Sequence, residues 1–280
     1  MERTRRAVTV AMAIGNSGAA SGSVVASIEA ADVDVVEITL DGSVQNPAFS
    51  PDGTELLVTV WRGGYNLGPA DLVVVPLAGS EPWELIADGW DNVSLPGSAW
   101  SEAADAIVYS STEDPHDEIW MIDVAGDHST RRITLHDDEV AYEPSWSPDG
   151  TEVVYELHPF DVEGEGRVAR APASGSDVEN VAAEVFLTPA GEDCRQPNWA
   201  AEGDLVVFQC TDDGESSADV WAVEVDGTGL EQITTDSGYE GAPSWSPDGT
   251  QIAFEASAGD PDGDRTVVRF IDVGGVFTAP

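Results

Sequence analysis

The chain has 280 residues, of which 53 are acidic and 11 are basic, all arginine, so the formal net charge is −42. This charge excludes duplex DNA and anionic membranes as partners, because both are bound through basic patches. The absence of lysine excludes a phosphate loop, which requires Gly-Lys-Ser/Thr. The acidic residues are spread over the whole chain, which favours a surface that stays hydrated in high salt. A cation-binding role and a GC-rich coding bias towards arginine are the alternatives.

Residues 1–31 have the pattern of an export signal. A basic start with Arg5 and Arg6, similar to a twin-arginine signal, precedes the mildly apolar stretch Ala7–Ile14, and small residues follow. A disordered tail or a misassigned start is the alternative. The apolar stretch is too short to span a bilayer. We therefore expect an exported protein (periplasmic or extracellular) with no membrane span and a single domain over residues 32–280.

The dominant pattern after this segment is a repeated turn. Ser-Pro-Asp-Gly follows an aromatic residue three times, and weaker versions follow two further tryptophans. The aromatic residues are Phe49, Trp100, Trp146, Trp199 and Trp245, with steps of 51, 46, 53 and 46 residues. A period of this size predicts a repeat architecture. In the turn, proline presets φ, aspartate bonds the local backbone, and glycine takes the position that would strain a residue with a Cβ.

Each unit contains four short apolar runs, two around the turn and two after it. The third runs are Leu72–Val75, Ile119–Val124, Val168–Ala171, Val220–Val225 and Val267–Ile271. The fourth runs are Trp83–Ile86, Arg132–Leu135, Glu184–Leu187 and Leu230–Ile233. We predict an all-β fold, a β-propeller of five four-stranded blades, with no helix beyond the N-terminal segment. The fifth unit ends after its third strand, so we expect the opening strand Val35–Leu40 to join the last blade and close the ring.

The residues around the third full turn carry a family resemblance. Gln232-Ile233-Thr234, Pro243-Ser244-Trp245-Ser246-Pro247-Asp248-Gly249 and Asp219-Val220-Trp221 resemble the PD40 (WD40-like) repeats of the TolB propeller family. The resemblance covers roughly residues 35–275. It implies a propeller that binds protein partners, such as an envelope lipoprotein.

The two cysteines, Cys194 and Cys210, flank the turn of the fourth hairpin. Counting register across that turn pairs residue 200 with 205, and therefore Arg195 with Cys210, so the cysteines should be near neighbours. A cross-hairpin disulfide is the expectation, and it would agree with export. Two free thiols are the alternative.

We expect function at the face opposite the Ser-Pro-Asp-Gly turns, because long and varied loops gather there on a rigid frame. Its aromatic residues suit a peptide or a glycan, although such rings also pack between blades. Tyrosine–glutamate pairs and amides before the innermost strands should surround the entrance of the central channel. The candidate binding residues are Asn46, Trp61, Tyr65, Trp90, Tyr142, Glu143, Arg195, Gln196, Tyr239 and Glu240.

One loop spaces three carboxylates two residues apart, as at the start of a calcium loop. They are Asp260, Asp262 and Asp264, and residue 271, where a calcium loop would end on glutamate, is Ile271. Calcium is therefore the one cofactor that the sequence suggests. Aspartate–glycine loops without a metal are also routine between such strands.

Motifs of enzymes are absent from the sequence. It has no Gly-x-Ser-x-Gly elbow and no His-Glu-x-x-His, and we interpret its four histidines as solvated loop residues. The favoured hypothesis is a non-catalytic, monomeric, exported propeller that binds a protein or peptide at its loop-rich face. The alternative binds or cleaves a glycan, with Glu143 and Glu240 as converging carboxylates.

Overall fold

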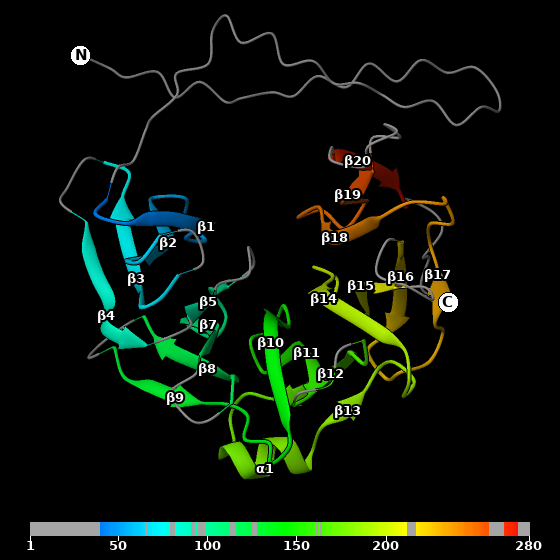
Figure 1. Ribbon diagram of the computed structural model, residues 1–280, viewed down its shortest axis with the longest axis horizontal. Helices are drawn as coiled ribbons and strands as arrows, with labels where there is room; N and C mark the ends of the chain where they lie inside the picture. Colours follow the sequence, from blue (N-terminus) through cyan, green and yellow to red (C-terminus); the bar gives the residue numbers. More distant parts are fainter. Residues whose placement is uncertain are drawn as a thin grey trace, which may run out of the picture. The chain divides into compact units, whose positions relative to one another are not determined.

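A computed structural model describes residues 40–64, 67–78, 82–90, 93–94, 99–111, 116–124, 128–160, 162, 164–211, 217–257 and 266–273. They form five antiparallel sheets that follow one another along the chain as the blades of a β-propeller (Figure 1). The predicted fold class and number of blades are confirmed. The candidate export signal lies outside the described residues. In the part of the chain that the structure describes, no helix is long and apolar enough to cross a membrane.

The strands of each blade follow in chain order from the innermost outwards. The first two blades contain β1 (Ser43–Phe49), β2 (Glu55–Trp61), β3 (Ala70–Pro76) and β4 (Trp83–Trp90), then β5 (Val93–Ser94), β6 (Trp100–Ser101), β7 (Ala106–Ser111), β8 (Glu118–Asp123) and β9 (Thr130–Arg132). The third and fourth contain β10 (Glu139–Trp146), β11 (Glu152–Pro159), β12 (Arg167–Pro172) and β13 (Val185–Phe186), then β14 (Asp193–Trp199), β15 (Leu205–Thr211), β16 (Ala218–Glu224) and β17 (Glu231–Gln232). The fifth contains β18 (Glu240–Trp245), β19 (Gln251–Ser257) and β20 (Thr266–Asp272).

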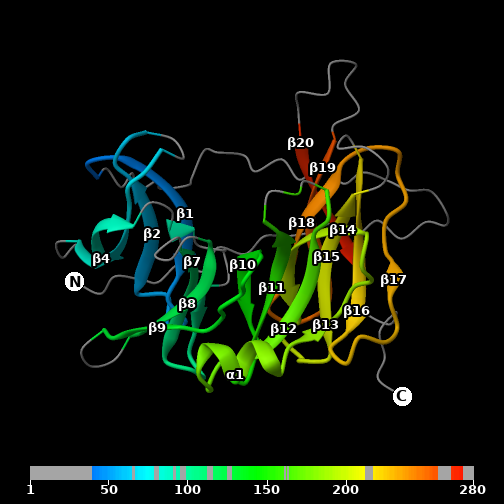
Figure 2. The same ribbon diagram turned by 60° about the horizontal axis from the view of Figure 1, so that its bottom comes forward.

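A short helix, α1 (Asp177–Ala182), corrects the prediction that no helix follows the N-terminal segment. Ser176 and Glu179 form a capping box that satisfies free backbone N–H groups at its start. The Asp177 carboxylate accepts a hydrogen bond from Arg132 Nε at 2.9 Å, so α1 joins the third blade to the outer strand of the second (Figure 2).

The repeated turns have the chemistry predicted for them. In the third blade, Asp149 accepts hydrogen bonds from Ser147 Oγ at 2.7 Å and from the backbone N–H of Thr151 at 3.0 Å. Gly150 has φ 70°. A Cβ at Gly150 would lie 2.6 Å from the backbone nitrogen of Ala104, which belongs to the turn of the second blade. The glycine therefore serves the left-handed backbone and the close approach of neighbouring blades together.

The core consists of apolar clusters between adjacent blades. Leu57 and Leu72 of the first blade pack with Ile107 and Tyr109 of the second, and all four are fully buried. Comparable clusters join the second blade to the third, the third to the fourth and the fourth to the fifth. Burial at about 25 cal/mol per Å² of apolar surface thus holds each blade to its neighbours.

Four innermost strands share one irregularity of the backbone. Each contains a residue of positive φ directly before a proline, and the strand ladder slips at that point. The residues are Asn46 (φ 51°), Glu143 (48°), Gln196 (53°) and Ala242 (48°). The slip corrects the predicted register of the fourth hairpin: Cys194, and not Arg195, lies opposite Cys210. Counting back from the turn failed because a β-bulge inserts an extra residue.

The outer strand of the fifth blade is unusually exposed. Val268 is 62% exposed, whereas the residues at the same register in three other blades, Ile119, Val168 and Val220, are fully buried. Among the described residues, this blade has three strands. The strand predicted to complete it, Val35–Leu40, lies almost entirely outside the described residues.

Candidate functional site

Predicted residues of three consecutive blades lie at or beside the bulges of neighbouring innermost strands. The innermost strands β10, β14 and β18 are neighbours. Their bulges lie near the middle of these strands. Tyr142, Glu143, Arg195 and Gln196 belong to the strands and not to loops before them, whereas Tyr239 directly precedes β18. We call this group the channel mouth: Tyr142, Glu143, Arg195, Gln196 and Tyr239.

Tyr142 is held by a buried carboxylate of the second blade. Its hydroxyl donates to Asp117 Oδ2 at 2.6 Å, and Asp117 is 7% exposed at the start of β8. Burial, followed by the hydrogen bond and charge of Asp117, raises the pKa of Tyr142 well above its ordinary value. The phenol therefore stays protonated and keeps its orientation.

Arg195 is held by a carboxylate of its own strand. Its Nε and Nη2 donate to the two oxygens of Asp193 at 2.9 and 3.1 Å, and the Gly166 N–H donates to the same carboxylate at 3.0 Å. Burial acts to raise the pKa of Asp193, but Arg195, the Gly166 N–H and the charge of His158 outweigh it and lower that pKa. The fork geometry fixes the plane of the guanidinium.

Tyr239 reaches the mouth by a different route. The register position of Tyr142 and Arg195 is occupied in the fifth blade by Gly241. A Cβ there would lie 1.9 Å from Gln209 Oε1 and 2.5 Å from the Tyr239 hydroxyl. The hydroxyl donates to Gln209 Oε1 at 3.0 Å. The glycine thus admits the side chain of Tyr239, which lies two residues earlier in the chain and directly before β18.

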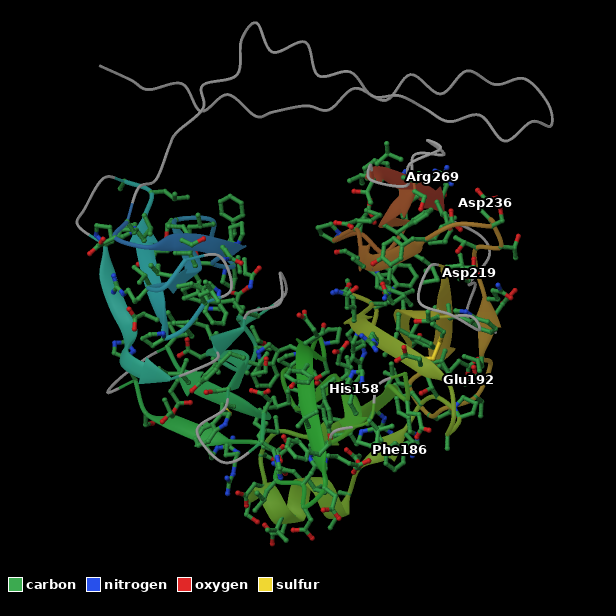
Figure 3. All side chains as sticks on the ribbon, viewed as in Figure 1. His158, Phe186, Glu192, Asp219, Asp236 and Arg269 are labelled. Atoms are coloured by element: carbon green, nitrogen blue, oxygen red, sulfur yellow. A yellow bond between two sulfur atoms is a disulfide. The ribbon has the colours of Figure 1, made fainter. Side chains whose placement is uncertain are left out.

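Side chains of the second strands bind the bulges of the next blade. Glu156 Oε2 accepts the backbone N–H of Gln196 at 2.7 Å, and Gln209 Oε1 accepts that of Ala242 at 2.9 Å. Glu156 Oε1 lies 3.2 Å from His158 Nε2. His158, labelled in Figure 3, comes from β11, as Glu156 does. These contacts connect the third, fourth and fifth blades at the mouth.

Glu143 is another titratable group at the mouth whose surroundings change its pKa. Burial, followed by the negative charge of Glu156, raises the pKa of Glu143 to about 7. Among the residues that the structure describes, its carboxylate has no hydrogen-bond or ion-pair partner, and Gln196 Oε1 is buried without one. At the mouth, the Glu143 carboxylate and Gln196 Oε1 are therefore acceptors without a donor among the described residues.

Other predicted site residues lie elsewhere. Asn46 occupies the bulge of the first blade, and Trp61 is 6% exposed in the core between the first two blades. Tyr65 and the side chain of Trp90 lie outside the described residues. Glu240 is 3% exposed and pairs with Arg269 Nη1 at 2.9 Å.

The two tyrosine–glutamate pairs are therefore not equivalent. Glu143 is the residue before the proline of its bulge, whereas Glu240 precedes Pro243 by three positions and lies opposite Ala256. Arg269, the partner of Glu240, also contacts Asp236 at the outer side of the fifth blade (Figure 3). The structure thus gives Glu143 and Glu240 different surroundings.

Cys194 and Cys210 are joined by a disulfide across the fourth hairpin. The proposed calcium ligands Asp260, Asp262 and Asp264 lie outside the described residues. Within the ranges that are described, no group of three or more His, Cys, Asp or Glu side chains is arranged to hold a metal.

The residues that sequence reasoning missed are the partners of the mouth. Asp117, Asp193, Glu156 and Gln209 hold it in place, and the last two interrupt otherwise apolar strands, a signal that could have found them. His158 was also interpreted as a solvated loop residue, and it is buried within β11 beside Glu156.

His136 is a second buried histidine, outside the mouth, and it corrects the same interpretation. It is 7% exposed, with Nδ1 2.9 Å from Glu118 Oε2 and Nε2 3.4 Å from Glu184 Oε1. Burial lowers the pKa of His136, but hydrogen bonds and charges of both glutamates outweigh this and raise it to about 9. The imidazolium therefore bridges the second and third blades.

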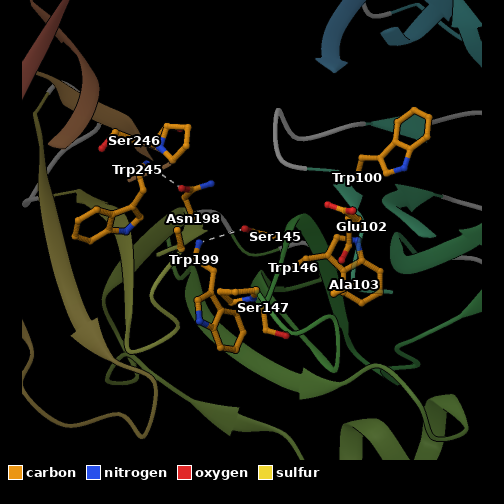
Figure 4. Close-up of a pocket in the computed structure, with 15 residues that line it drawn as sticks. Trp100, Glu102, Ala103, Ser145, Trp146, Ser147, Asn198, Trp199, Trp245 and Ser246 are labelled. Atoms are coloured by element: carbon orange, nitrogen blue, oxygen red, sulfur yellow. Dashed lines mark hydrogen bonds between the residues drawn. The ribbon is translucent and has the colours of Figure 1, made fainter. Parts of the chain in front are cut away.

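A cavity of about 610 Å³ lies among the Trp-Ser segments at the turn side of the second to fifth blades (Figure 4). Its polar groups serve the fold. Ser145 Oγ accepts the backbone N–H of Trp199 at 3.2 Å, and Asn198 Oδ1 accepts that of Trp245 at 3.0 Å. Ser147 binds its own turn. We therefore place the candidate site at the channel mouth.

Comparison with solved structures supports the architecture. A TolB from Agrobacterium tumefaciens matches 84% of this chain and 78% of its own, with a TM-score of 0.65 and 21% identity. TolB from Acinetobacter baumannii matches 80% and 51%, with a TM-score of 0.62 and 18% identity. An oligogalacturonate lyase from Vibrio parahaemolyticus matches 86% and 69%, with a TM-score of 0.58 and 13% identity. Identities this low show a shared fold alone.

Comparison of sequences leads to the family. Dipeptidyl-peptidase 5 of Porphyromonas gingivalis is 30% identical over 97 residues, which are 34% of this chain and only 14% of the peptidase. The PD40 family model, described as the TolB beta propeller domain, matches residues 93–279. With its repeated turns and five blades, this chain belongs to the TolB beta propeller domain family.

Proposed function

We propose that the protein is a non-catalytic propeller that binds a protein or peptide partner at the channel mouth. The observation that carries the proposal is that, among the mouth residues, three neighbouring blades each hold a large polar side chain by a hydrogen bond. Tyr142 is fixed by Asp117, Arg195 by Asp193, and Tyr239 by a glutamine. Tyrosine and arginine are the residues that most often dominate binding between proteins.

Fixed side chains favour recognition because less conformational entropy is lost on binding. The three residues are half-buried, so part of each stays accessible to a partner. Kinship to proteins named TolB supports a partner that is itself a protein. The Cys194–Cys210 disulfide supports an exported protein, since disulfides persist in oxidising compartments.

Affinity capture with matched baits tests the proposal. The wild-type protein, a mouth variant (Tyr142→Ala with Tyr239→Ala) and a turn-side control (Glu102→Ala with Ser244→Ala) are used on envelope extract. Both control residues are exposed and lie at the cavity of the turn side. We expect a partner that is retained by wild type and control and whose affinity for the mouth variant falls at least roughly tenfold.

A partner retained by the mouth variant and lost by the turn-side control would move the site to the cavity. A second capture, with Arg195→Ala, separates the contribution of the guanidinium. Capture of the same proteins by every bait would count against a specific site at either end.

A second candidate function is glycan cleavage, and one observation favours it. A carboxyl with a pKa of about 7, as at Glu143, is suited to donate a proton to a leaving group. The likeness to oligogalacturonate lyases points to acidic sugars as substrates. Product release from a polysaccharide panel, abolished by Glu143→Gln, would replace the first proposal. Because Glu240 is paired with Arg269, Glu156 would be the second carboxylate.

A further inference from the structure

We propose that the channel mouth receives a lysine or arginine side chain of the partner, bound between the carboxylates of Glu143 and Glu156 with the amide oxygen of Gln196 as a third acceptor. This inference deepens the proposed function and rests on it. It concerns which chemical group of the partner enters the mouth.

The first argument is the presence of acceptors without a donor. Glu143 has no partner among the described residues, and Gln196 Oε1 is buried without one. Glu156 is 7% exposed and receives the Gln196 N–H and the His158 imidazole. Glu143 is half-buried, whereas Gln196 Oε1 is a fully buried atom. A buried acceptor is normally satisfied, so a group that brings several N–H donors would complete this site. Ammonium and guanidinium groups have three and five such donors.

The second argument comes from the next blade. Glu156 and Gln209 have the same structural role, because each accepts a hydrogen bond from the backbone N–H of the bulge residue in the next blade. The neutral amide of Gln209 shows that this link needs no charge. A carboxylate at 156 therefore adds a negative charge beside Glu143 that the fold does not require, and the charge of Glu156 contributes to the raised pKa of Glu143. A cationic ligand would convert this repulsion into attraction.

The third argument concerns orientation. Arg195, the cation of the mouth itself, is turned to Asp193 by a two-point ion pair. The ion pair fixes its guanidinium at Asp193, a carboxylate of its own strand. Tyr142 lies opposite Glu156 in the strand register, and its ring centroid is 6.1 Å from that of His158. A long side chain could extend its methylene groups along such a ring.

Peptide selection tests the inference directly. A random dodecapeptide library is selected on the folded, disulfide-bonded chain in about 0.5 M NaCl, because salt screens diffuse attraction to a protein with net charge −42. We expect wild type to enrich peptides with lysine or arginine at one fixed position. Replacing that residue with glutamine should weaken binding roughly tenfold or more, as for other hydrogen bonds to charged groups.

The matched variants are Glu143→Gln and Glu156→Gln, and the second keeps an acceptor for the blade link as Gln209 does. Each variant should weaken binding of the basic peptide roughly tenfold and leave binding of the glutamine-substituted peptide unchanged. The substitution in the protein and the substitution in the peptide would then be energetically coupled. Glu202→Gln and Glu231→Gln, at two exposed positions, each remove one negative charge elsewhere and should have no effect.

Peptides that bind the mouth, as shown by weaker binding to Tyr239→Ala, but are indifferent to Glu143→Gln would overturn this inference and leave the proposed function standing. Failure of every peptide to bind the mouth would count against both. Binding of Ca²⁺ by the pair, with no preference for basic peptides, would also overturn it.

Discussion

The substitution Glu143→Gln should make the protein more stable above neutral pH. The pKa of Glu143 rises from its ordinary value of 4.5 to about 7 in the folded state. Between pH 4.5 and about pH 7, the folded state therefore binds more protons at Glu143 than the unfolded state does. Stability therefore falls as pH rises through this window, and the full cost is present above about pH 7. At ~1.36 kcal/mol per unit of pKa, the difference between the two pKa values destabilises the folded state by about 3 kcal/mol.

Glutamine has nearly the same shape as glutamate and no charge, so the variant lacks the destabilisation that the charged Glu143 causes. We expect its free energy of unfolding to exceed that of wild type by under about 1 kcal/mol at pH 5 and by roughly 2–3 kcal/mol at pH 8. Urea unfolding at constant ionic strength and several pH values measures both. Work below pH 5 is avoided because the isoelectric point is about 4.1.

Glu202→Gln, at an exposed position, is the control and should change stability equally at all pH values. Glu156→Gln should reduce the pH dependence of wild type, because it removes the charge that acts on Glu143. A stability gain for Glu143→Gln that does not grow between pH 5 and pH 8 would refute the assignment of this cost to a buried charge.

Three further predictions concern stability and binding. His136→Gln should remove a contribution of about 3 kcal/mol that wild type has fully below pH 6.5 and loses as pH rises through about 9, so the two unfolding curves should converge by pH 9.5. Gly241→Ala should cost about 1–3 kcal/mol through the clash with a glutamine oxygen and displace Tyr239, which should weaken partner binding. Cys194→Ser with Cys210→Ser should cost about 3 kcal/mol in thermal or urea unfolding, the loop-closure value for their separation of 16 residues, and a reductant should reproduce the loss in wild type.

The parts of the fold that local chemistry specifies could be read from the sequence. Each Ser-Pro-Asp-Gly string encodes its own turn, so the blades could be counted before any contact was known. The proximity of Cys194 and Cys210 followed in the same way from the hairpin. Their register could not, because a bulge at Gln196 adds a residue between the turn and the pair.

The candidate site was harder to predict because it depends on contacts between blades. Tyr142 and Tyr239 both reach the mouth, yet from different register positions, and only the packing of Gly241 against Gln209 shows why. Glu156 acts through the backbone of the next blade, which periodicity along one strand does not show. The strand Val35–Leu40 as closure of the fifth blade stays a prediction.

The four bulges have a consequence for how such a mouth could be redesigned. None of their positive-φ positions is glycine, although glycine would adopt that backbone without the cost of order 1 kcal/mol that other residues incur. Asparagine, glutamate, glutamine and alanine all occupy the same backbone geometry. The bulge positions therefore accept different side chains on the same backbone. A binding surface could be changed one blade at a time by substituting single bulge residues, while the strand pairing keeps its register.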